Sequence, residues 1–251
     1  MAYGLTKSMR LTAASSQYAG AADSASLSVT GNLTIEFWIK MKETLGSGAA
    51  RCLVVKSTLG ATQRSYEVLY QNVGGTPRLY FYIFTGGTPT NYYENYINKT
   101  LTADTWYHVA MICTTANAAA TKVEWVFDGT SAGNGTGTNT GTGCTAIFDS
   151  TKACRIGQAD PTTPGYYPDA QFSLVRIWAE ARTATQINTN KCSLLGATTN
   201  LSAEWTLDDV YTDNSGNSNT LTGSGTPTFV TDTPSTCGVT TNTTNFFNLM
   251  E

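Results

Sequence analysis

Hydrophobic and polar side chains alternate along most of this chain, in short runs rich in β-branched and aromatic residues. A period of two places successive side chains on opposite faces of a strand, so each run predicts a β-strand. The predicted strands are 33–42, 51–57, 65–71, 78–84, 106–113, 122–129, 154–159, 172–180, 201–209 and 220–230. Segments rich in Gly, Asn and Pro separate these runs, and such residues favour chain reversals. The pattern predicts an all-β fold: a two-sheet antiparallel β-sandwich of the jelly-roll kind.

Two segments depart from this rhythm. Residues 181–196 read ARTATQINTNKCSLLG, with a Thr start and the closing Gly196, and they predict one short helix. Residues 129–143 are nearly all Gly, Thr, Ser and Asn, and such a segment can bury almost nothing. We therefore predict a mobile loop there, at one end of the sandwich.

A β-sandwich often takes roughly 200 to 250 residues as one unit, so residues 1–230 are predicted to form a single jelly-roll domain. Residues 231–251 are predicted to form a C-terminal tail. This tail carries Phe246, Phe247 and Leu249 in a polar context. It either frays, as chain ends commonly do, or docks on a neighbouring copy in a homo-oligomer.

Charge and hydropathy exclude two classes of partner. Charged residues make up only 13% of the chain, and the net charge is −3. Without a basic stripe to neutralise phosphates, nucleic acid is not a predicted partner. No segment approaches the roughly 20 apolar residues that span a bilayer, so no membrane partner is predicted either. The first residues lack the apolar core of a secretion signal, and export is not expected unless a signal has been removed.

The six cysteines show no CxxC pair, and the chain has a single histidine, so a zinc site has little support. We expect six reduced and mostly buried thiols, as in a protein made in a reducing compartment. In the alternative, the segment between Cys144 and Cys154 folds back and brings these two residues together.

Four segments, taken in order, resemble the laminin G-like jelly rolls of the concanavalin A-like lectin and glucanase superfamily. They are SMRLTAASSQYA, SLSVTGNLTIEFWIKMK, DTWYHVAMICTTANAAATKVEWVFDGT and RIGQADPTTPGYYPDAQFSLVRIWAEARTATQI. The resemblance runs from about residue 8 to residue 230. It implies a strand buried through Phe37 and Trp38, and a hairpin turn at Asp128 and Gly129.

The acidic residues do not match a catalytic pattern. Enzymes on this fold that cleave β-glucans resemble one another in a strand with three acidic residues at near-alternate positions, which supply acid and nucleophile. Glu124 with Asp128, and Glu204 with Asp208, each lack a third carboxylate. His108 is the only imidazole, and no serine or cysteine motif accompanies it. We predict that the protein is not an enzyme and has no catalytic residues.

A calcium site is a further hypothesis. Family members resemble one another in an acidic pair before the Val-Arg-Ile-aromatic run, and Ser173 and Leu174 stand there instead, which puts the family's cation site in doubt. The segment DNSGNSN still offers oxygen ligands, and a hard cation prefers oxygen. The candidate metal-binding residues are Asp208, Asp213, Ser215 and Asn217, with Asn219 nearby. A turn stabilised by side-chain hydrogen bonds explains the same residues without metal.

Aromatic residues on predicted loops supply a binding hypothesis. A sugar ring has an apolar C–H face and a polar rim, and it binds flat aromatic faces that lie beside polar groups. The candidate carbohydrate-binding residues are Tyr92, Tyr93, Tyr96, Tyr166 and Asp169. In the alternative these tyrosines serve packing, as Tyr167 does by its resemblance to a family position.

The function predicted from these features is that of a non-enzymatic structural or adhesion protein on a bacteriophage virion surface, as a capsid decoration, fibre or tail appendage. Its partners would be other virion proteins, further copies of itself and cell-surface polysaccharide. The alternative is a carbohydrate-binding module of a bacterial surface or secreted protein, located outside the cell or at its surface. Both readings rest on family analogy and not on side-chain chemistry.

Overall fold

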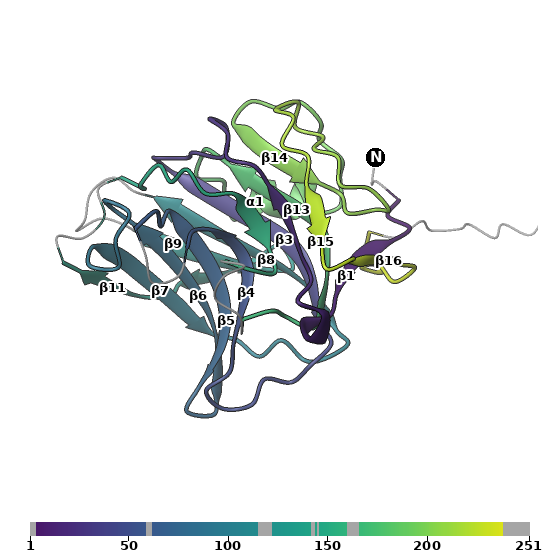
Figure 1. Ribbon diagram of the computed structural model, residues 1–251, viewed down its shortest axis with the longest axis horizontal. Helices are drawn as coiled ribbons and strands as arrows, with labels where there is room; N and C mark the ends of the chain where they lie inside the picture. The colour runs from purple at the N-terminus through teal and green to yellow at the C-terminus, as the bar shows by residue number, and fades with distance from the viewer. Residues whose placement is uncertain are drawn as a thin grey trace, which may run out of the picture.

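The computed structural model describes residues 4–58, 62–114, 122–141, 144, 146–159 and 166–237. Two antiparallel sheets lie face to face as a β-sandwich (Figure 1), which confirms the predicted fold class. The first sheet runs β10 (Thr130–Asn134), β9 (Lys122–Phe127), β8 (Trp106–Thr114), β3 (Leu33–Met41), β13 (Ala170–Trp178), β1 (Ser8–Leu11) and β16 (Thr228–Val230), with β14 (Leu201–Trp205) also paired to β13.

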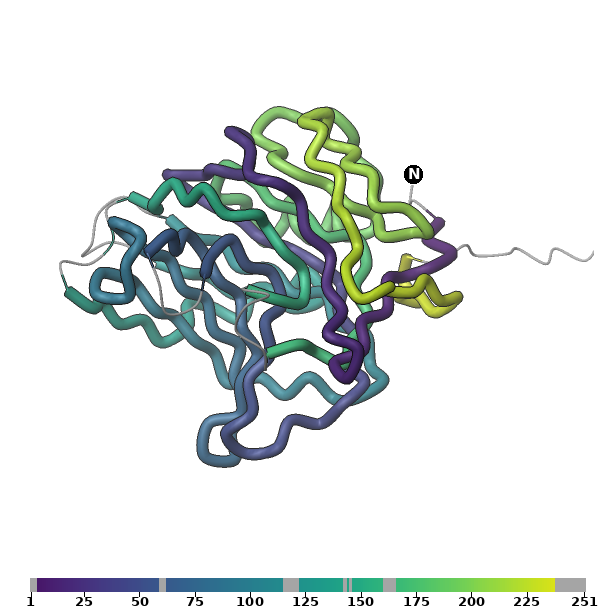
Figure 2. Tube along the Cα trace, viewed as in Figure 1, coloured from purple at the N-terminus to yellow at the C-terminus, as the bar shows by residue number. Residues whose placement is uncertain are grey.

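The second sheet runs β11 (Thr136–Thr140), β7 (Tyr92–Asn98), β6 (Thr76–Phe84), β5 (Tyr66–Val73), β4 (Ala50–Lys56), β12 (Cys154–Ile156), β2 (Tyr18–Ala21) and β15 (Thr222–Ser224). A 3₁₀ turn, η1 (Ala13–Ser15), joins β1 to β2. The two ends of the described chain lie side by side (Figure 2), because β1 pairs with β16 in one sheet and β2 with β15 in the other.

The core fills the space between the sheets with the inward side chains of both. From β3, Ile35, Phe37 and Ile39 are fully buried in it, and Phe37 lies 6.1 Å from Phe172 of β13 between ring centroids. Trp38 points to the opposite face, as alternation requires. The predicted hairpin turn is also present, with positive φ angles at Asp128 and Gly129.

The predicted helix is present as α1 (Ala184–Asn190). Thr183 caps it: its hydroxyl accepts a hydrogen bond from the Gln186 backbone N–H, and the Gln186 side chain accepts one from the Thr183 N–H. This reciprocal capping box satisfies two N–H groups that the first turn would otherwise leave unpaired. Neither described helix has the length and apolar character that crossing a bilayer requires.

The prediction of a mobile loop over 129–143 was wrong for most of that segment. Thr130–Asn134 pairs with β9 of the first sheet, and Thr136–Thr140 pairs with β7 of the second. Gly135 lies between them, where a Cβ atom would collide with Asn95 and Trp125. The missing side chain therefore lets the backbone cross from one sheet to the other over the Trp125 ring, whose Nε1 donates to Asn95 Oδ1 at 2.7 Å.

The expectation of six reduced thiols was wrong for one pair, because Cys192 and Cys237 form a disulfide. The other four cysteines are buried and unbridged, so Cys144 and Cys154 do not form the alternative pair. Burial raises the pKa of Cys154 to about 11, and this thiol is therefore protonated at neutral pH. The disulfide joins the segment after α1 to the C-terminal segment. No spacing of cysteines in the sequence indicated this pairing.

The described beginning of the predicted tail, residues 231–237, packs on the sandwich itself. Lys40 Nζ and Trp106 Nε1 both donate to Asp232, at 2.8 and 3.1 Å. Cys237 lies in a buried cluster with Trp38 and Leu174 on the outer face of the first sheet. Phe246, Phe247 and Leu249 lie outside the described residues, so docking of the tail on a second copy stays a prediction.

A buried charge network occupies the same outer face. Arg176 donates to Glu204 Oε1 from Nε at 2.8 Å and lies 3.4 Å from Glu36 Oε1, and Trp178 Nε1 donates to that same Glu36 oxygen at 2.9 Å. His108 Nε2 lies 3.3 Å from the other Glu36 oxygen. All of these side chains are fully buried. His108 and Glu204 therefore belong to an internal network, in keeping with a structural role for the histidine.

This network fastens the segment that contains α1 to the first sheet. Arg176 donates to the Asn190 carbonyl oxygen at 3.1 Å, while Glu204 accepts hydrogen bonds from the backbone N–H groups of Leu195 and Gly196 at 3.0 and 2.9 Å. These charged side chains thus supply hydrogen-bond partners for backbone groups of the segment around α1, which covers the first sheet and pairs with no strand.

We expect Gly135→Ala to lower the free energy of unfolding by about 1–3 kcal/mol, because the added methyl group overpacks the sheet crossing. Urea unfolding followed by tryptophan fluorescence measures this change. Gly46→Ala is the matched control, since a Cβ atom there meets nothing within 4 Å. Equal stabilities of the two variants would contradict the role given to Gly135.

Glu36 makes the free energy of unfolding depend on pH. Burial alone would raise its pKa, but the Arg176 charge, His108 and Trp178 outweigh burial and lower the pKa to about 2. A lowered folded-state pKa contributes stability that is present above the unfolded value of about 4.5 and lost as pH falls towards 2, amounting to about 3 kcal/mol.

Unfolding free energies measured between pH 6 and pH 2.5 test this dependence. The wild-type protein should lose more stability over this range than Glu36→Gln, whose amide does not titrate. The same pH slope in both proteins would show that Glu36 is not the group responsible.

Candidate functional site

The outer face of the second sheet carries aromatic side chains where a solvated strand would carry polar ones. Strand β6 is apolar on both faces because its sequence, TPRLYFYIF, interleaves two apolar sets. The set that enters the core is Leu79, Phe81 and Ile83. The set on the outer face is Tyr80, Tyr82 and Phe84, and β7 adds Tyr92 and Tyr96 beside it. We call these five outward residues the aromatic band.

The rings of the aromatic band touch one another in sequence. Along β6, the centroids of Tyr80 and Tyr82 lie 5.7 Å apart with planes 10° apart, and those of Tyr82 and Phe84 lie 6.2 Å apart. From β7, Tyr96 lies 5.3 Å from Tyr80 and Tyr92 lies 5.9 Å from Tyr82. These offset contacts hold the rings in a fixed arrangement.

A pocket of about 280 Å³ opens at one end of the aromatic band. Tyr82, Phe84 and Tyr92 line it, and Tyr166 reaches it from the segment after β12. Its polar lining residues are Arg64, Glu67, Gln71 and Glu94. Apolar ring faces and fixed polar groups thus meet in one concavity, which we call the aromatic pocket.

Arg64 organises the polar side of the aromatic pocket. Its guanidinium carbon lies 4.1 Å from the centroid of the Phe84 ring, and its Nε and Nη2 donate to the two carboxylate oxygens of Glu67 at 2.9 and 3.0 Å. Ser57 donates a third hydrogen bond to Glu67 at 2.6 Å. Burial raises the pKa of Glu67 although Arg64 and Ser57 oppose it. The carboxyl group of Glu67 is therefore fully engaged within the wall.

Tyr82 stands directly opposite Glu94 on the neighbouring strand. Burial, reinforced by the Glu94 charge and the hydrogen bond between the two side chains, raises the pKa of Tyr82 far above its usual value. Its hydroxyl group is therefore protonated at neutral pH and directed at a carboxylate. This pair adds a second fixed polar contact to the pocket.

The opposite end of the aromatic band has a hollow of about 290 Å³ beside Tyr96, with Asn98 and Asn134 in its lining. Arg78 lies with its guanidinium carbon 4.5 Å from the centroid of the Tyr96 ring and donates to Asn98 Oδ1 at 3.1 Å. The aromatic band therefore has polar hollows at both ends, a layout suited to a ligand longer than one ring.

The structure brings together three of the five predicted carbohydrate-binding residues. Tyr92 and Tyr166 line the aromatic pocket, and Tyr96 lies in the band. Their neighbour Tyr93 was misplaced, because 92–98 is a strand and not a loop, so alternation turns Tyr93 into the core at 6% exposure. Asp169 does not line the pocket: it forms an ion pair with Arg10 at 3.2 Å.

Sequence reasoning missed Tyr80, Tyr82, Phe84 and Arg64. The run RLYFYIF was assigned to a strand, but its outer face was not considered. After Arg78 this run is aromatic or aliphatic on both faces, which signals that both faces are covered or bind something. That signal was available in the sequence.

The profile of the concanavalin A-like lectin/glucanases superfamily matches residues 13–188, which is more than half of the chain. The chain belongs to this superfamily. No protein with a curated description matches it. The predicted resemblance is thus confirmed at the level of the family.

Among solved structures, a candidate carbohydrate-binding protein from Bacteroides ovatus gives a TM-score of 0.65 at 21% identity, over 91% of this chain and 60% of its own length. The heptameric SAP-like pentraxin of Limulus polyphemus gives 0.53 at 12% identity, over 89% of this chain and 97% of its own. The CBM40 of a Ruminococcus gnavus IT-sialidase, solved with α2,3-sialyllactose, gives 0.50 at 12% identity, over 74% of this chain and 98% of its own. At these identities the likeness establishes the fold.

The positions where the superfamily resemblance led us to look for an acidic pair, Ser173 and Leu174, are covered. Leu174 is fully buried and packs with Trp38 and Cys237. The Ser173 hydroxyl group donates to the Thr206 carbonyl oxygen at 3.3 Å. Neither position offers a carboxylate, and the disulfide-bonded C-terminal segment lies against Leu174.

The predicted calcium ligands fall into two groups. The Asp213 carboxylate accepts hydrogen bonds from the backbone N–H groups of Glu204, Ser215 and Asn219 at 3.0, 2.9 and 2.8 Å, and from the Ser215 hydroxyl group at 2.9 Å. Asn217 joins the same loop through Ser215. These contacts match the alternative of a turn built on side-chain hydrogen bonds.

Asp208 is engaged elsewhere, because its Oδ1 accepts hydrogen bonds from Thr6 and from the Lys7 backbone N–H at 2.6 Å. Within the part of the chain that the structure describes, no three or more His, Cys, Asp or Glu side chains gather in a way that could hold a metal ion. The calcium site stays a prediction, and the donors around Asp213 favour a hydrogen-bonded anchor.

We expect Asp213→Asn to lower the free energy of unfolding by about 2 kcal/mol, because an amide cannot accept all four hydrogen bonds and its NH₂ group opposes backbone N–H donors. The loss should be equal with calcium and with EDTA. Asp209→Asn, at an exposed carboxylate paired with Lys7, is the control. A calcium-dependent rise in melting temperature that only Asp213→Asn abolishes would favour the metal instead.

Proposed function

We propose that this protein is a carbohydrate-binding module that binds glycans on the aromatic band. The observation that carries the proposal is the aromatic pocket itself, where the half-buried rings of Tyr82 and Tyr92 lie beside Arg64 and Glu94, with Phe84 buried under the Arg64 guanidinium group. Such a surface stacks on the C–H face of a sugar and hydrogen-bonds its hydroxyl groups.

The polar hollows at both ends of the band support a ligand of several sugar units. Successive outward residues of a strand are about 6.6–6.8 Å apart. Tyr80 is only 6% exposed, so the half-buried rings of Tyr82, Tyr92 and Tyr96 are the surfaces on which sugar units could stack. An extended oligosaccharide would lie along the band with its hydroxyl groups reaching Glu94 at one end and Asn98 at the other.

We infer a non-catalytic role from the state of the carboxyl groups. Glycoside hydrolysis usually requires two carboxyl groups that are free to act as acid and as base or nucleophile. In the aromatic pocket, Glu67 is held by Arg64 and Ser57, and Glu94 is hydrogen-bonded to Tyr82. Both carboxyl groups therefore have a structural role in the wall of the pocket.

The proposed location is outside the cell or at its surface. The Cys192–Cys237 disulfide supports it, since disulfides persist in oxidising compartments. The Bacteroides ovatus and Ruminococcus gnavus proteins, which share the fold, point to carbohydrate binding as well. The virion-surface role with other virion proteins as partners has no such support and stays a prediction from sequence.

We expect Tyr92→Ala to weaken binding of a glycan identified on an array by about tenfold or more, because one stacking face is lost, whereas Tyr92→Trp should retain binding. Isothermal titration calorimetry measures the dissociation constants. Tyr18→Ala is the matched control, since Tyr18 is a half-buried outward residue on β2, and four strands separate β2 from β7 in the same sheet.

Binding of no glycan on the array, or equal dissociation constants for the wild-type protein and Tyr92→Ala, would contradict the proposed site. Chromatography of the bound glycan after long incubation tests the second half of the proposal. Intact glycan is expected, and shortened products would show that the protein is an enzyme.

A further inference from the structure

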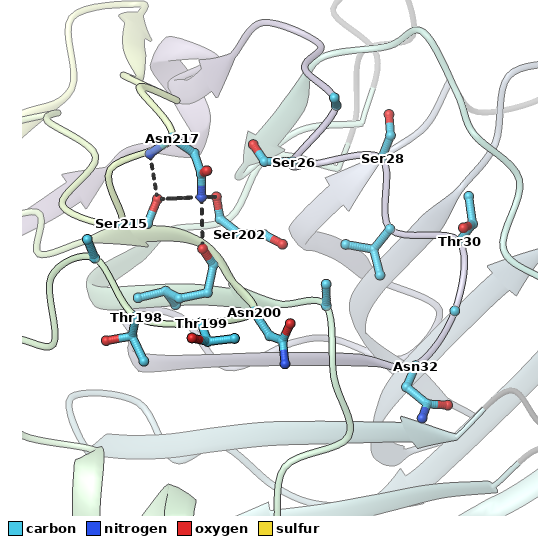
Figure 3. Close-up of a pocket in the computed structure, with 16 residues that line it drawn as sticks. Ser26, Ser28, Thr30, Asn32, Thr198, Thr199, Asn200, Ser202, Ser215 and Asn217 are labelled. Atoms are coloured by element: carbon cyan, nitrogen blue, oxygen red, sulfur yellow. Dashed lines mark hydrogen bonds between the residues drawn. The ribbon is translucent and has the colours of Figure 1, made fainter.

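A second concavity, of about 600 Å³, lies at the rim of the sandwich and shares no lining residue with the aromatic pocket. One wall is the extended segment between β2 and β3. Its buried residues, Leu27 and Val29, alternate with polar residues that line the concavity. Those polar residues are Ser26, Ser28, Thr30 and Asn32 (Figure 3). We call this concavity the polar groove.

The opposite wall comes from the start of β14 and from the loop around Asp213. Thr198, Thr199 and Asn200 form its lower part (Figure 3). Asn217 is fixed above them, because its Nδ2 donates to the carbonyl oxygens of Leu201 and Ser202 at 2.8 and 3.1 Å. The loop that Asp213 holds together therefore also fixes one side of the groove.

Ser202 marks the floor of the groove. The residue is only 4% exposed, and its hydroxyl group points into the space between the two walls (Figure 3). Within the described part of the chain this hydroxyl group has no hydrogen-bond partner, whereas the Ser202 carbonyl oxygen accepts several. A nearly buried donor and acceptor of this kind is available to a ligand.

The chemistry of the walls defines the ligand. Hydroxyl and amide groups face the groove from both sides, and none of the described residues that line it is charged or aromatic. A charged ligand would be desolvated there without an opposite charge, and a flat apolar ligand would find no ring to stack on. The volume falls within the range of roughly 300–1,000 Å³ that is usual for small-molecule sites.

We propose that the polar groove is a second binding site, which takes a neutral, hydroxyl-rich sugar by hydrogen bonds alone. The Ser202 hydroxyl group and the side-chain oxygen of Asn217 would contact the sugar from one wall, and Ser28 and Thr30 from the other. The two sites would bind sugars through different interactions. The aromatic band would stack on the faces of sugar rings, and the groove would form hydrogen bonds with their hydroxyl groups. This site stands independently of the proposed function of the aromatic band.

The test is a titration of the ¹⁵N-labelled full chain with D-glucose, D-galactose, D-mannose and N-acetyl-D-glucosamine, each up to tens of millimolar, followed by amide chemical shifts. At least one neutral sugar should shift the amides of residues 26–32 and 198–202 in a saturable way. D-glucuronic acid, which carries a charge, should leave them unshifted.

Two variants locate the site. Ser28→Trp fills the groove and should raise the dissociation constant measured from the saturable shifts by tenfold or more. Ser202→Ala removes only the floor hydroxyl group and should raise this constant several-fold. Tyr92→Ala should leave the shifts unchanged, so failure at the groove and failure at the aromatic band are distinguishable. A spectrum that is unshifted away from the substituted residue confirms the fold of each variant.

Three results would overturn the proposal. The first is the absence of saturable shifts at the groove with every neutral sugar. The second is an equal response to glycerol, which would indicate an adventitious additive only. The third is loss of the shifts in Tyr92→Ala with retention in Ser28→Trp, which would assign the sugar to the aromatic band.

Discussion

The alternation of side chains along strands in the middle of the second sheet is the constraint on which the rest of the structure depends. A strand has two faces, and β6 is apolar on both, so one set of residues must close the core while the other set needs a cover of its own. Stacking of the outward rings on one another, and of Arg64 and Arg78 on the rings, supplies part of that cover. The rings that remain half-buried are those of Tyr82, Tyr92 and Tyr96, and Arg64 and Glu94 lie beside them in the aromatic pocket.

Strands rich in β-branched and aromatic residues could be predicted from the sequence, because these residue types themselves favour the extended conformation. Strand β7 and the edge strands β10 and β11 could not, because their residues favour turns and the hydrogen bonds of neighbouring strands impose the extended form. The error propagated to the candidate site. Once 92–98 is a strand, Tyr92 and Tyr93 must point to opposite faces, and only one of them can contact a ligand.

The remaining features depend on contacts between residues far apart in the chain. Glu36, Arg176 and Glu204 come from three adjacent strands of the first sheet and meet only when β13 lies between β3 and β14. The disulfide spans 45 residues and joins two segments that the sheet brings together. No local pattern encodes such contacts, so the sequence could suggest neither the covering segment on the first sheet nor the oxidised cysteine pair.

The outer faces of the two sheets are covered in different ways. The outer face of the first sheet is closed by α1, by the charge network beneath it and by the segment that Cys237 anchors, and Leu174 is buried against that segment. On the outer face of the second sheet, Tyr80 is buried with Cys52, Leu69 and Ala159, and Phe84 is buried under the Arg64 guanidinium group. Tyr82, Tyr92 and Tyr96 of the aromatic band stay half-buried. The half-buried rings of Tyr82, Tyr92 and Tyr96 are therefore the part of this face that a ligand could still cover, and the proposed binding of glycans depends on them.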